Sequence, residues 1–283
     1  LDGVTGVQTC ALPISFLRFI PLSSFSGVNL KKVATLTLGV TGGVGVLYID
    51  DIGLSPKDRE LITPVQPDAA GLVAKYAFEG NANDSAGTRH GTVTGAPQYV
   101  AGKVGQAIQL DGARDYVWVE GAFDLPVYSV AAWLRVSGGT AERDVVSIYN
   151  SAGNHGILIE VLNQNATGTN GGLRFLHRGP AGSTTGSNFY SNFAYTDGGW
   201  YHAAIVKSVD TTTAYIDGVP VLSAADTTQF GGNLDELAIG VLKDDNLTRY
   251  FPGMIDEVCL YNRALSAAEV AGLAGRTAPY DKP

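Results

Sequence analysis

Oxygen-bearing side chains gather in one short stretch, "FEGNANDSAG" at residues 78–87. The stretch holds Glu79, Asn81, Asn83 and Asp84 directly after a segment with the pattern of a strand. Calcium takes about six to eight oxygen ligands from carboxylates, amides and backbone carbonyls, so this composition predicts a structural Ca²⁺ site. The alternative is an Asx-rich turn that is closed by its own side chain–backbone hydrogen bonds.

Side chains that could perform hydrolysis are not arranged for it in the sequence. Two carboxylates share one face of a strand only when their spacing is even, and Asp256 and Glu257 are adjacent, which predicts opposite faces. Histidines that bind a metal occur at short, regular spacing, whereas the four histidines of this chain are dispersed. They are His90, His155, His177 and His202. The sequence therefore predicts a protein that is not an enzyme.

Aromatic and amide side chains are the groups that bind sugars, by ring stacking and by a few fixed hydrogen bonds. The sequence offers one main group of candidates: Tyr149, Asn150, Asn154 and His155. Two further groups are Asn188, Phe189 and Tyr190, and Tyr250 with Phe251. The alternative for each aromatic residue is a place in the core or at the rim of the fold.

The composition excludes several classes of partner. The chain has 283 residues and a net charge of −8, and a nucleic-acid-binding surface needs clustered Lys and Arg instead. An anionic membrane surface is excluded for the same reason. The sequence contains no apolar run of the roughly 18 residues that a membrane span requires, so no membrane insertion is expected.

The N-terminal segment is unusual in origin. Residues 4–14, "VTGVQTCALPI", resemble the translation of an adapter oligonucleotide used in sequencing libraries. We therefore expect residues 1–15 to be non-native, the sequence to come from a metagenome assembly, and the true N-terminus to lie upstream. Without Cys10 the chain keeps only Cys259, which cannot form an intrachain disulfide and is predicted to be inert.

Strand-length apolar segments separated by Gly, Asn and Asp turns follow one another from residue 71 to about residue 265, with "TTAYIDGVPVL" (212–222) among them. Ten or so short strands in about 200 residues predict an all-β fold, a two-sheet antiparallel jelly-roll sandwich. One short C-terminal helix is predicted at 266–275, with Ser266 as N-cap and Glu269 completing a capping box. Residues 277–283 are expected to be a tail.

The region before the sandwich reads as a separate piece. Three strands are predicted at 16–20, 33–40 and 44–54, which is too few to close a sandwich, and the prolines in 57–70 indicate a linker. Residues 16–56 resemble the C-terminal tail of galactose-binding-like carbohydrate modules. The matching residues include Ile20-Pro21-Leu22, Val28-Asn29-Leu30 and Asp50-Asp51-Ile52.

Four motifs in residues 71–276 carry a second resemblance. They are Tyr76-x-Phe78-x-Gly80, Ala107-x-x-Leu110-Asp111-Gly112, Trp200-x-His202 and Gly253-x-Ile255-Asp256-Glu257-Val258. In this order they resemble the laminin-G-like, concanavalin A-like jelly rolls, including the pentraxin-like branch. The resemblance implies a rigid sandwich that binds glycans or proteins, often with Ca²⁺, is usually not catalytic, and occurs in secreted multidomain proteins.

The resemblance also assigns residues. It implies that the first and last strands pair, which would bring Asp256 to the calcium loop as a fifth candidate ligand. In the pentraxin-like branch a ligand cluster follows the strand before the last, and the equivalent residues here are Asp244, Asp245 and Asn246. Leu242 and Lys243 replace oxygen donors at this place. Sequons at Asn83, Asn165 and Asn246 are possible glycosylation sites.

Two hypotheses of function follow. The first is a non-catalytic binding and adhesion module, secreted or on the cell surface, whose partner is a glycan or an extracellular protein. The second is a structural subunit, in which the incomplete sandwich at 16–56 receives a strand from the next copy of the chain and builds a head-to-tail filament.

Overall fold

The computed structural model describes residues 60–282, except 140, 164–167, 233 and 244–247. It divides into two compact units, residues 62–279 and residues 1–61 with 280–282. In the second unit the described residues include β17 (Tyr280–Asp281), which pairs with β1 (Leu61–Ile62). The predictions for residues 1–15 and 16–56, and with them the filament hypothesis, lie outside the described residues and stay predictions.

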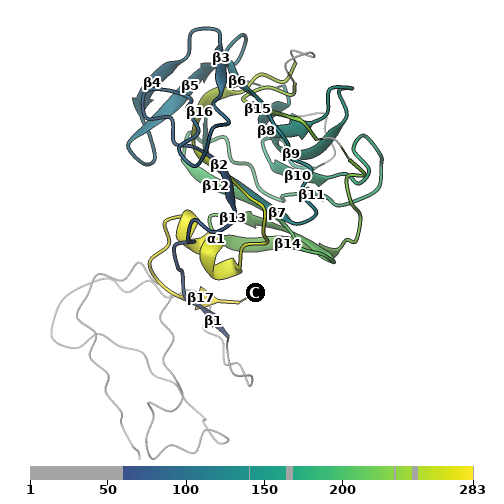
Figure 1. Cartoon of the computed structure of the whole chain (residues 1–283). Helices are drawn as coiled ribbons and strands as arrows, with labels where there is room; N and C mark the ends of the chain where they lie inside the picture. Colours follow the sequence, from purple (N-terminus) through teal and green to yellow (C-terminus); the bar gives the residue numbers. More distant parts are fainter. Residues whose placement is uncertain (1–59, 140, 164–167, 233, 244–247, 283) are drawn as a thin grey trace, which may run out of the picture. The chain divides into compact units, whose positions relative to one another are not determined.

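Residues 62–279 form two antiparallel sheets that face each other (Figure 1). The first sheet has seven strands in its described part, in the order β11-β10-β9-β8-β15-β6-β3. Their bounds are β3 (Thr92–Thr94), β6 (Tyr116–Glu120), β8 (Arg143–Tyr149), β9 (His155–Val161), β10 (Leu173–His177), β11 (Asn188–Tyr190) and β15 (Glu236–Ile239).

The second sheet has eight described strands, in the order β14-β13-β12-β7-β16-β5-β4, with β2 paired to β16. Their bounds are β2 (Leu72–Tyr76), β4 (Gln98–Ala101), β5 (Gln106–Asp111), β7 (Tyr128–Val136), β12 (Tyr201–Lys207), β13 (Thr211–Ile216), β14 (Val219–Ala225) and β16 (Pro252–Tyr261). The pairing of β2 with β16 joins the first and last strands of the sandwich, as the resemblance implied.

One apolar core lies between the two sheets, because alternate residues of each strand point inward. In β9 the inward residues Ile157, Ile159 and Val161 are buried in this core, while Glu160 between them points outward. The core draws on both sheets, from Phe175 of β10 to Ile205 of β12. The predicted all-β, two-sheet sandwich is confirmed.

The predicted helix is also confirmed. Helix α1 (Ala267–Leu273) begins after Ser266, whose side chain and that of Glu269 form the expected capping box. Val270 of α1 packs with Ala131, Cys259 and Tyr261 on the side of the eight-stranded sheet that is turned away from the core. The helix therefore covers this sheet from outside.

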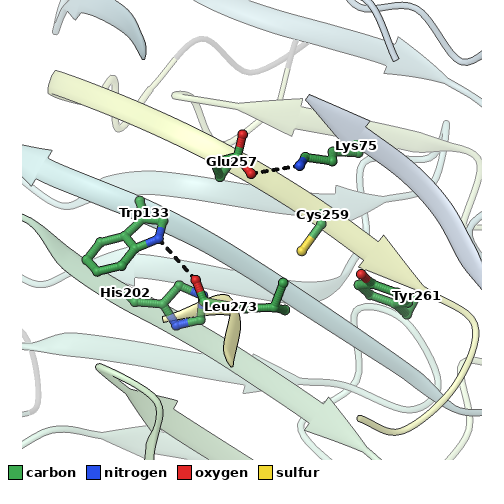
Figure 2. A pocket seen from close by; sticks show the side chains of 7 residues that line it. All are labelled: Lys75, Trp133, His202, Glu257, Cys259, Tyr261 and Leu273. Atoms are coloured by element: carbon green, nitrogen blue, oxygen red, sulfur yellow. Dashed lines mark hydrogen bonds and ion pairs between the residues drawn. The ribbon is translucent and has the colours of Figure 1, made fainter. Parts of the chain in front are cut away.

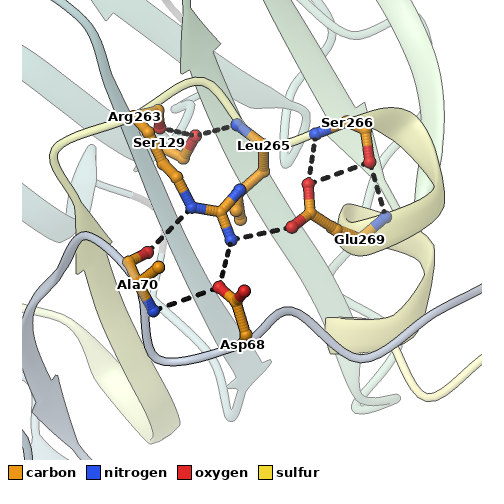
Figure 3. A network of polar contacts seen from close by, with 7 residues as sticks. All are labelled: Asp68, Ala70, Ser129, Arg263, Leu265, Ser266 and Glu269. Carbon is orange, nitrogen blue, oxygen red and sulfur yellow. Dashed lines mark hydrogen bonds and ion pairs between the residues drawn. The ribbon is translucent and has the colours of Figure 1, made fainter.

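Arg263 holds the turn that leads into α1 (Figure 3). Arg263 forms ion pairs with Glu269 (2.7 Å) and Asp68 (3.2 Å), and its Nε donates to the carbonyl oxygen of Ala70 at 2.8 Å. The hydroxyl of Ser129 in β7 donates to the carbonyl of Arg263, so the same turn is also bonded to the sheet.

Two local predictions were wrong. The segment 212–222 is a hairpin, not one strand, because Asp217 (φ 48°) and Gly218 (φ 76°) form a tight turn between β13 and β14. Strict alternation also fails after Asp256, since a bulge with Glu257 at φ 49° interrupts β16. The argument that placed Asp256 and Glu257 on opposite faces therefore does not hold at this position.

No helix in the described part of the chain is long and apolar enough to cross a membrane.

Candidate functional site

The predicted calcium ligands are divided between two places. The buried carboxylate of Asp84 accepts hydrogen bonds from the backbone N–H groups of Lys75, Ala86 and Arg89. The exposed Asn81 bonds within its own turn, to Asn83 N and Glu79 O. This part of the loop thus has the self-bonded turn geometry that was the alternative to a metal site.

The other two carboxylates meet the turn between β4 and β5. Glu79 accepts from the N–H of Gln106 at 3.1 Å, and Asp256 accepts from the N–H groups of Lys103 and Val104 at 2.8 and 2.9 Å. Burial raises the pKa of Asp256 to about 6, and its Oδ1 is buried without a hydrogen-bond partner. Across the described residues no three His, Cys, Asp or Glu side chains gather as metal ligands would. Calcium stays a prediction for which these residues do not assemble a complete donor set.

Aromatic and charged side chains gather on a different surface. We call it the outer face: the side of the seven-stranded sheet that is turned away from the core. On one part of it Tyr116, Trp118 and Tyr149 cluster with Tyr250 and Val241. The rings of Tyr116 and Tyr250 lie 6.3 Å apart, and those of Trp118 and Tyr250 are partly exposed. The outer face therefore presents aromatic surface to solvent.

Beside the aromatic cluster runs a charged row across four neighbouring strands. In register, Tyr190 of β11 lies opposite Arg174 of β10, Arg174 opposite Glu160 of β9, and Glu160 opposite Asp144 of β8. Glu160 is fully buried and accepts from Arg174 at 3.0 Å. The guanidinium of Arg174 also lies over the Tyr190 ring, 5.6 Å from its centroid.

The segment between β15 and β16 lies against this face. Arg249 pairs with Glu160 at 2.8 Å and with Glu142 at 2.7 Å, and its carbonyl accepts from the N–H of Asp144. Leu242 packs on Leu158 and Leu176 of the sheet. Each oxygen of Glu160 is thereby held by one arginine.

Within the described residues, four side chains of the outer face have buried polar atoms without a hydrogen-bond partner: Trp118 (Nε1), Ser147 (Oγ), His155 (Nδ1) and Asp144, with both carboxyl oxygens. Burial, and then the charge of Glu160, raise the pKa of Asp144 well above its ordinary value. Burial thus favours the neutral form of Asp144, which can donate a hydrogen bond. Unpaired buried polar groups are costly, so these atoms would gain from a polar partner that reaches them.

Asp144 and Glu160 form the pair of carboxylates that spacing within one strand could not reveal, because they come from adjacent strands. Their differing environments would suit acid–base catalysis. However, both side chains are fully buried, and both oxygens of Glu160 accept from arginines. The pair is therefore not placed to reach a substrate.

The structure brings some of the predicted ligand residues to this face. Tyr149 and His155 lie opposite each other at its end, and Tyr190 and Tyr250 also belong to it. Asn150 and Asn154 instead bond to each other in the β8–β9 turn, and Phe251 lies in the core.

Asp244, Asp245 and Asn246 lie outside the described residues, as does the sequon at Asn165. Lys243, just before them, donates to the carbonyl oxygen of Gly153 in the β8–β9 turn at 2.6 Å. Asn83, the asparagine of the remaining sequon, is exposed.

Sequence reasoning missed Trp118, Asp144, Glu160, Arg174 and Arg249. One signal was present: Glu160 interrupts the apolar run "GILIEVL", and a charge in a buried strand needs partners. Arg174 and Arg249, which supply those partners, come from a strand and a loop far along the chain, and pattern within one segment does not reveal such contacts.

A small pocket lies elsewhere, between α1 and the eight-stranded sheet (Figure 2). Lys75, Trp133, His202, Glu257, Cys259, Tyr261 and Leu273 line it. Lys75 pairs with Glu257 at 2.8 Å, and Trp133 Nε1 donates to the carbonyl of Leu273. Burial raises the pKa of Cys259 to about 12, so this thiol stays protonated. The bond from Trp133 attaches the helix to the sheet, whereas the Lys75–Glu257 pair joins two strands of that sheet. The pocket is a weaker candidate than the outer face.

Solved structures resemble this chain across the sandwich. Domain 4 of AbnA, an extracellular family GH43 arabinanase from Geobacillus stearothermophilus solved in complex with arabinotriose, is 25% identical with a TM-score of 0.58, over 72% of this chain and 98% of that domain. The binding domain of Paraclostridial Mosquitocidal Protein 1 is 18% identical (TM-score 0.59), and the receptor-binding domain of a botulinum neurotoxin C/D mosaic serotype is 14% identical (TM-score 0.56).

Each toxin match covers 72% of this chain but only about half of the toxin domain, 52% and 51% respectively, and at these identities it shows the fold alone. No curated protein sequence matches the chain. Residues 111–271, which are more than half of the chain, match the sequence profile of the Laminin_G_3 family. The chain therefore belongs to the concanavalin A-like lectin/glucanases superfamily.

Proposed function

We propose that residues 62–279 form a non-catalytic carbohydrate-binding module whose ligand lies on the outer face. The observation that carries this proposal is the convergence, on one face, of partly exposed aromatic rings with buried polar atoms that have no partner. Sugars have apolar ring faces and hydroxyl rims, so they need both kinds of group side by side.

The chemistry of the face suits this role. The partly exposed rings of Trp118 and Tyr250 offer stacking surface, while Tyr149 and Ala238 beneath them are fully buried and hold them in place. Trp118 Nε1 is a donor for a sugar oxygen. Asp144 and Glu160 are both fully buried and do not reach a substrate, which supports binding without catalysis.

The comparison with domain 4 of AbnA supports the same proposal. That domain was solved with arabinotriose bound, belongs to an extracellular enzyme, and is 98% covered by the match. We accordingly propose a glycan ligand, with arabinotriose as the first to test, and an extracellular place for this chain.

Calorimetric titration of the full chain with arabinotriose and a panel of neutral oligosaccharides tests the proposal. Trp118→Ala should weaken binding of the best ligand by about tenfold or more, since it removes an apolar ring and a donor together. Tyr201→Ala is the matched control, because this half-buried tyrosine belongs to the eight-stranded sheet and should leave binding unchanged. Equal losses in the two variants, with folding intact by circular dichroism, would contradict the outer face as the binding site.

A further inference from the structure

Positive charge gathers at one end of the outer face, although the whole chain carries a net charge of −8. His155 marks the place: burial, together with the charges of Arg178, Lys243, Arg249 and Arg174, lowers its pKa to about 4. His155 is therefore neutral at physiological pH. Four cations surrounding one neutral imidazole form a local field opposite in sign to that of the whole chain.

Two of these four cations are already neutralised. Arg174 and Arg249 share Glu160, and Arg249 also pairs with Glu142. Among the described residues, the other nearby acid is Asp144, and burial favours its neutral form.

Arg178 differs from Arg174 and Arg249. It follows β10, and its backbone N–H donates to the carbonyl oxygen of Gly156 at 2.8 Å, which places it next to His155 on the neighbouring strand. Its side chain is half-buried and forms no ion pair with any residue that the structure describes. Burial, and then the charge of Arg174, lower its pKa, yet a guanidinium stays protonated in proteins. Among the described residues, Arg178 is thus a partly desolvated cation without an ion-pair partner.

A planar guanidinium matches a carboxylate or a sulfate through two parallel hydrogen bonds. Trp118 lies on β6, four strand positions from β10, which is a separation of about 19 Å at the usual spacing of strands. A ligand that meets both Trp118 and Arg178 must therefore be a chain of several sugar units.

We infer that the outer face binds an acidic oligosaccharide, in which a uronic-acid carboxylate or a sulfate group pairs with Arg178 while a neutral part of the chain stacks on Trp118. This inference rests on the proposed function and specifies its ligand class. Glu142 and Glu160 do not oppose it, because their charges are held by Arg174 and Arg249.

Three ligands of matched backbone test it by calorimetry on the full chain: an oligogalacturonide, the same oligomer with its carboxyl groups reduced to alcohols, and that reduced oligomer carrying sulfate. We expect at least one charged ligand to bind about tenfold more tightly than the reduced oligomer at low salt, which is the usual order for one charge-assisted pair. This preference should shrink as salt is added. Whichever charged ligand binds more tightly identifies the anionic group.

Arg178→Gln should abolish the preference for charge and leave the affinity for the reduced oligomer unchanged. Arg135→Gln is the control, since Arg135 is an exposed arginine on β7 of the other sheet. Should the Gln variant unfold, Arg178→Lys keeps the charge without the planar fork and should retain a weaker, salt-sensitive preference.

Two outcomes would overturn the inference, and they are distinguishable. Equal binding of charged and reduced oligomers, in wild type and Arg178→Gln alike, refutes the role of Arg178 and leaves a neutral-sugar site standing. Failure to bind any of the three ligands, or arabinotriose, refutes the proposed function itself.

Discussion

At the scale of single residues, two buried carboxyl groups of the outer face differ in their hydrogen-bond and ion-pair partners. Two arginines hold the Glu160 carboxylate, whereas the Asp144 carboxyl opposite has no hydrogen-bond partner among the described residues, and burial raises its pKa. Burying a charge without a partner is unfavourable, which is the physical cause of this raised pKa.

This difference predicts a pH effect. The raised pKa of Asp144 means that the folded protein holds a proton which the unfolded chain releases above about pH 4. Stability from this group is therefore present at low pH and is lost as pH rises toward the folded pKa. Asp144→Asn mimics the protonated acid, so it should raise the free energy of unfolding increasingly as pH rises from about 4 toward the folded pKa, by at most about 1.4 kcal/mol per pH unit.

Urea unfolding at several pH values measures this gain. Asp197→Asn is the comparison, because hydrogen bonds from Gly199 and Tyr201 lower the pKa of this exposed carboxyl, so its substitution should not stabilise the protein. A variant Asp144→Asn that is no more stable than wild type at pH 8 would show that the pKa of Asp144 is not raised in the folded state.

At the scale of elements, local sequence determines where α1 begins. Ser266 Oγ accepts from the N–H of Glu269, and the Glu269 carboxylate accepts from the N–H of Ser266 at 2.8 Å. Arg263 adds an ion pair to the same carboxylate. All three residues lie within seven positions of the chain, so a motif of this kind can be recognised in the sequence.

Ser266→Ala should lower the free energy of unfolding by about 1 kcal/mol, because the N–H of Glu269 loses its acceptor. Thermal or urea unfolding measures the loss. Ser151→Ala, at an exposed serine of the β8–β9 turn, should change stability by less than about 0.5 kcal/mol. Equal, small changes in the free energy of unfolding of both variants would contradict this prediction. They would show that Arg263 stabilises the start of the helix enough to replace the cap.

The same reasoning explains what the sequence could and could not predict. The capping box predicted α1, since it depends on neighbours in the chain. The hairpin turn at Asp217-Gly218 was overlooked inside an apolar run, although an Asp-Gly pair is a turn signal.

The candidate site was predicted only in part. Tyr149, His155, Tyr190 and Tyr250 were chosen by residue type, and the structure places them on one face. The pairing of Glu160 with Arg174 and Arg249 depends on strand order and on a loop 89 positions away, which no single segment encodes.

At the scale of the whole molecule, the two sheets share one core and should unfold together. Phe175 of the seven-stranded sheet is fully buried in the same cluster as Ile205 and Ala203 of the eight-stranded sheet. A cavity on one side of this core therefore removes contacts from both sheets.

Phe175→Ala should lower the free energy of unfolding by about 3–5 kcal/mol. Phe193→Ala is the matched control, since this side chain is 73% exposed and its loss should cost less than about 0.5 kcal/mol. Tryptophan fluorescence and far-UV circular dichroism should report one coincident transition in both variants. Separate transitions would show that the sheets are independent.

The position of α1 has a consequence for how the module is displayed. The N–H of Val65 donates to the carbonyl of Ala268, and Gln66 Nε2 donates to that of Gly272, so the chain enters residues 62–279 beside the same helix by which it leaves. Both attachment points thus lie on the side of the eight-stranded sheet, and the outer face looks the opposite way. Coupling the module to a solid support through either end should leave the outer face pointing outward and accessible.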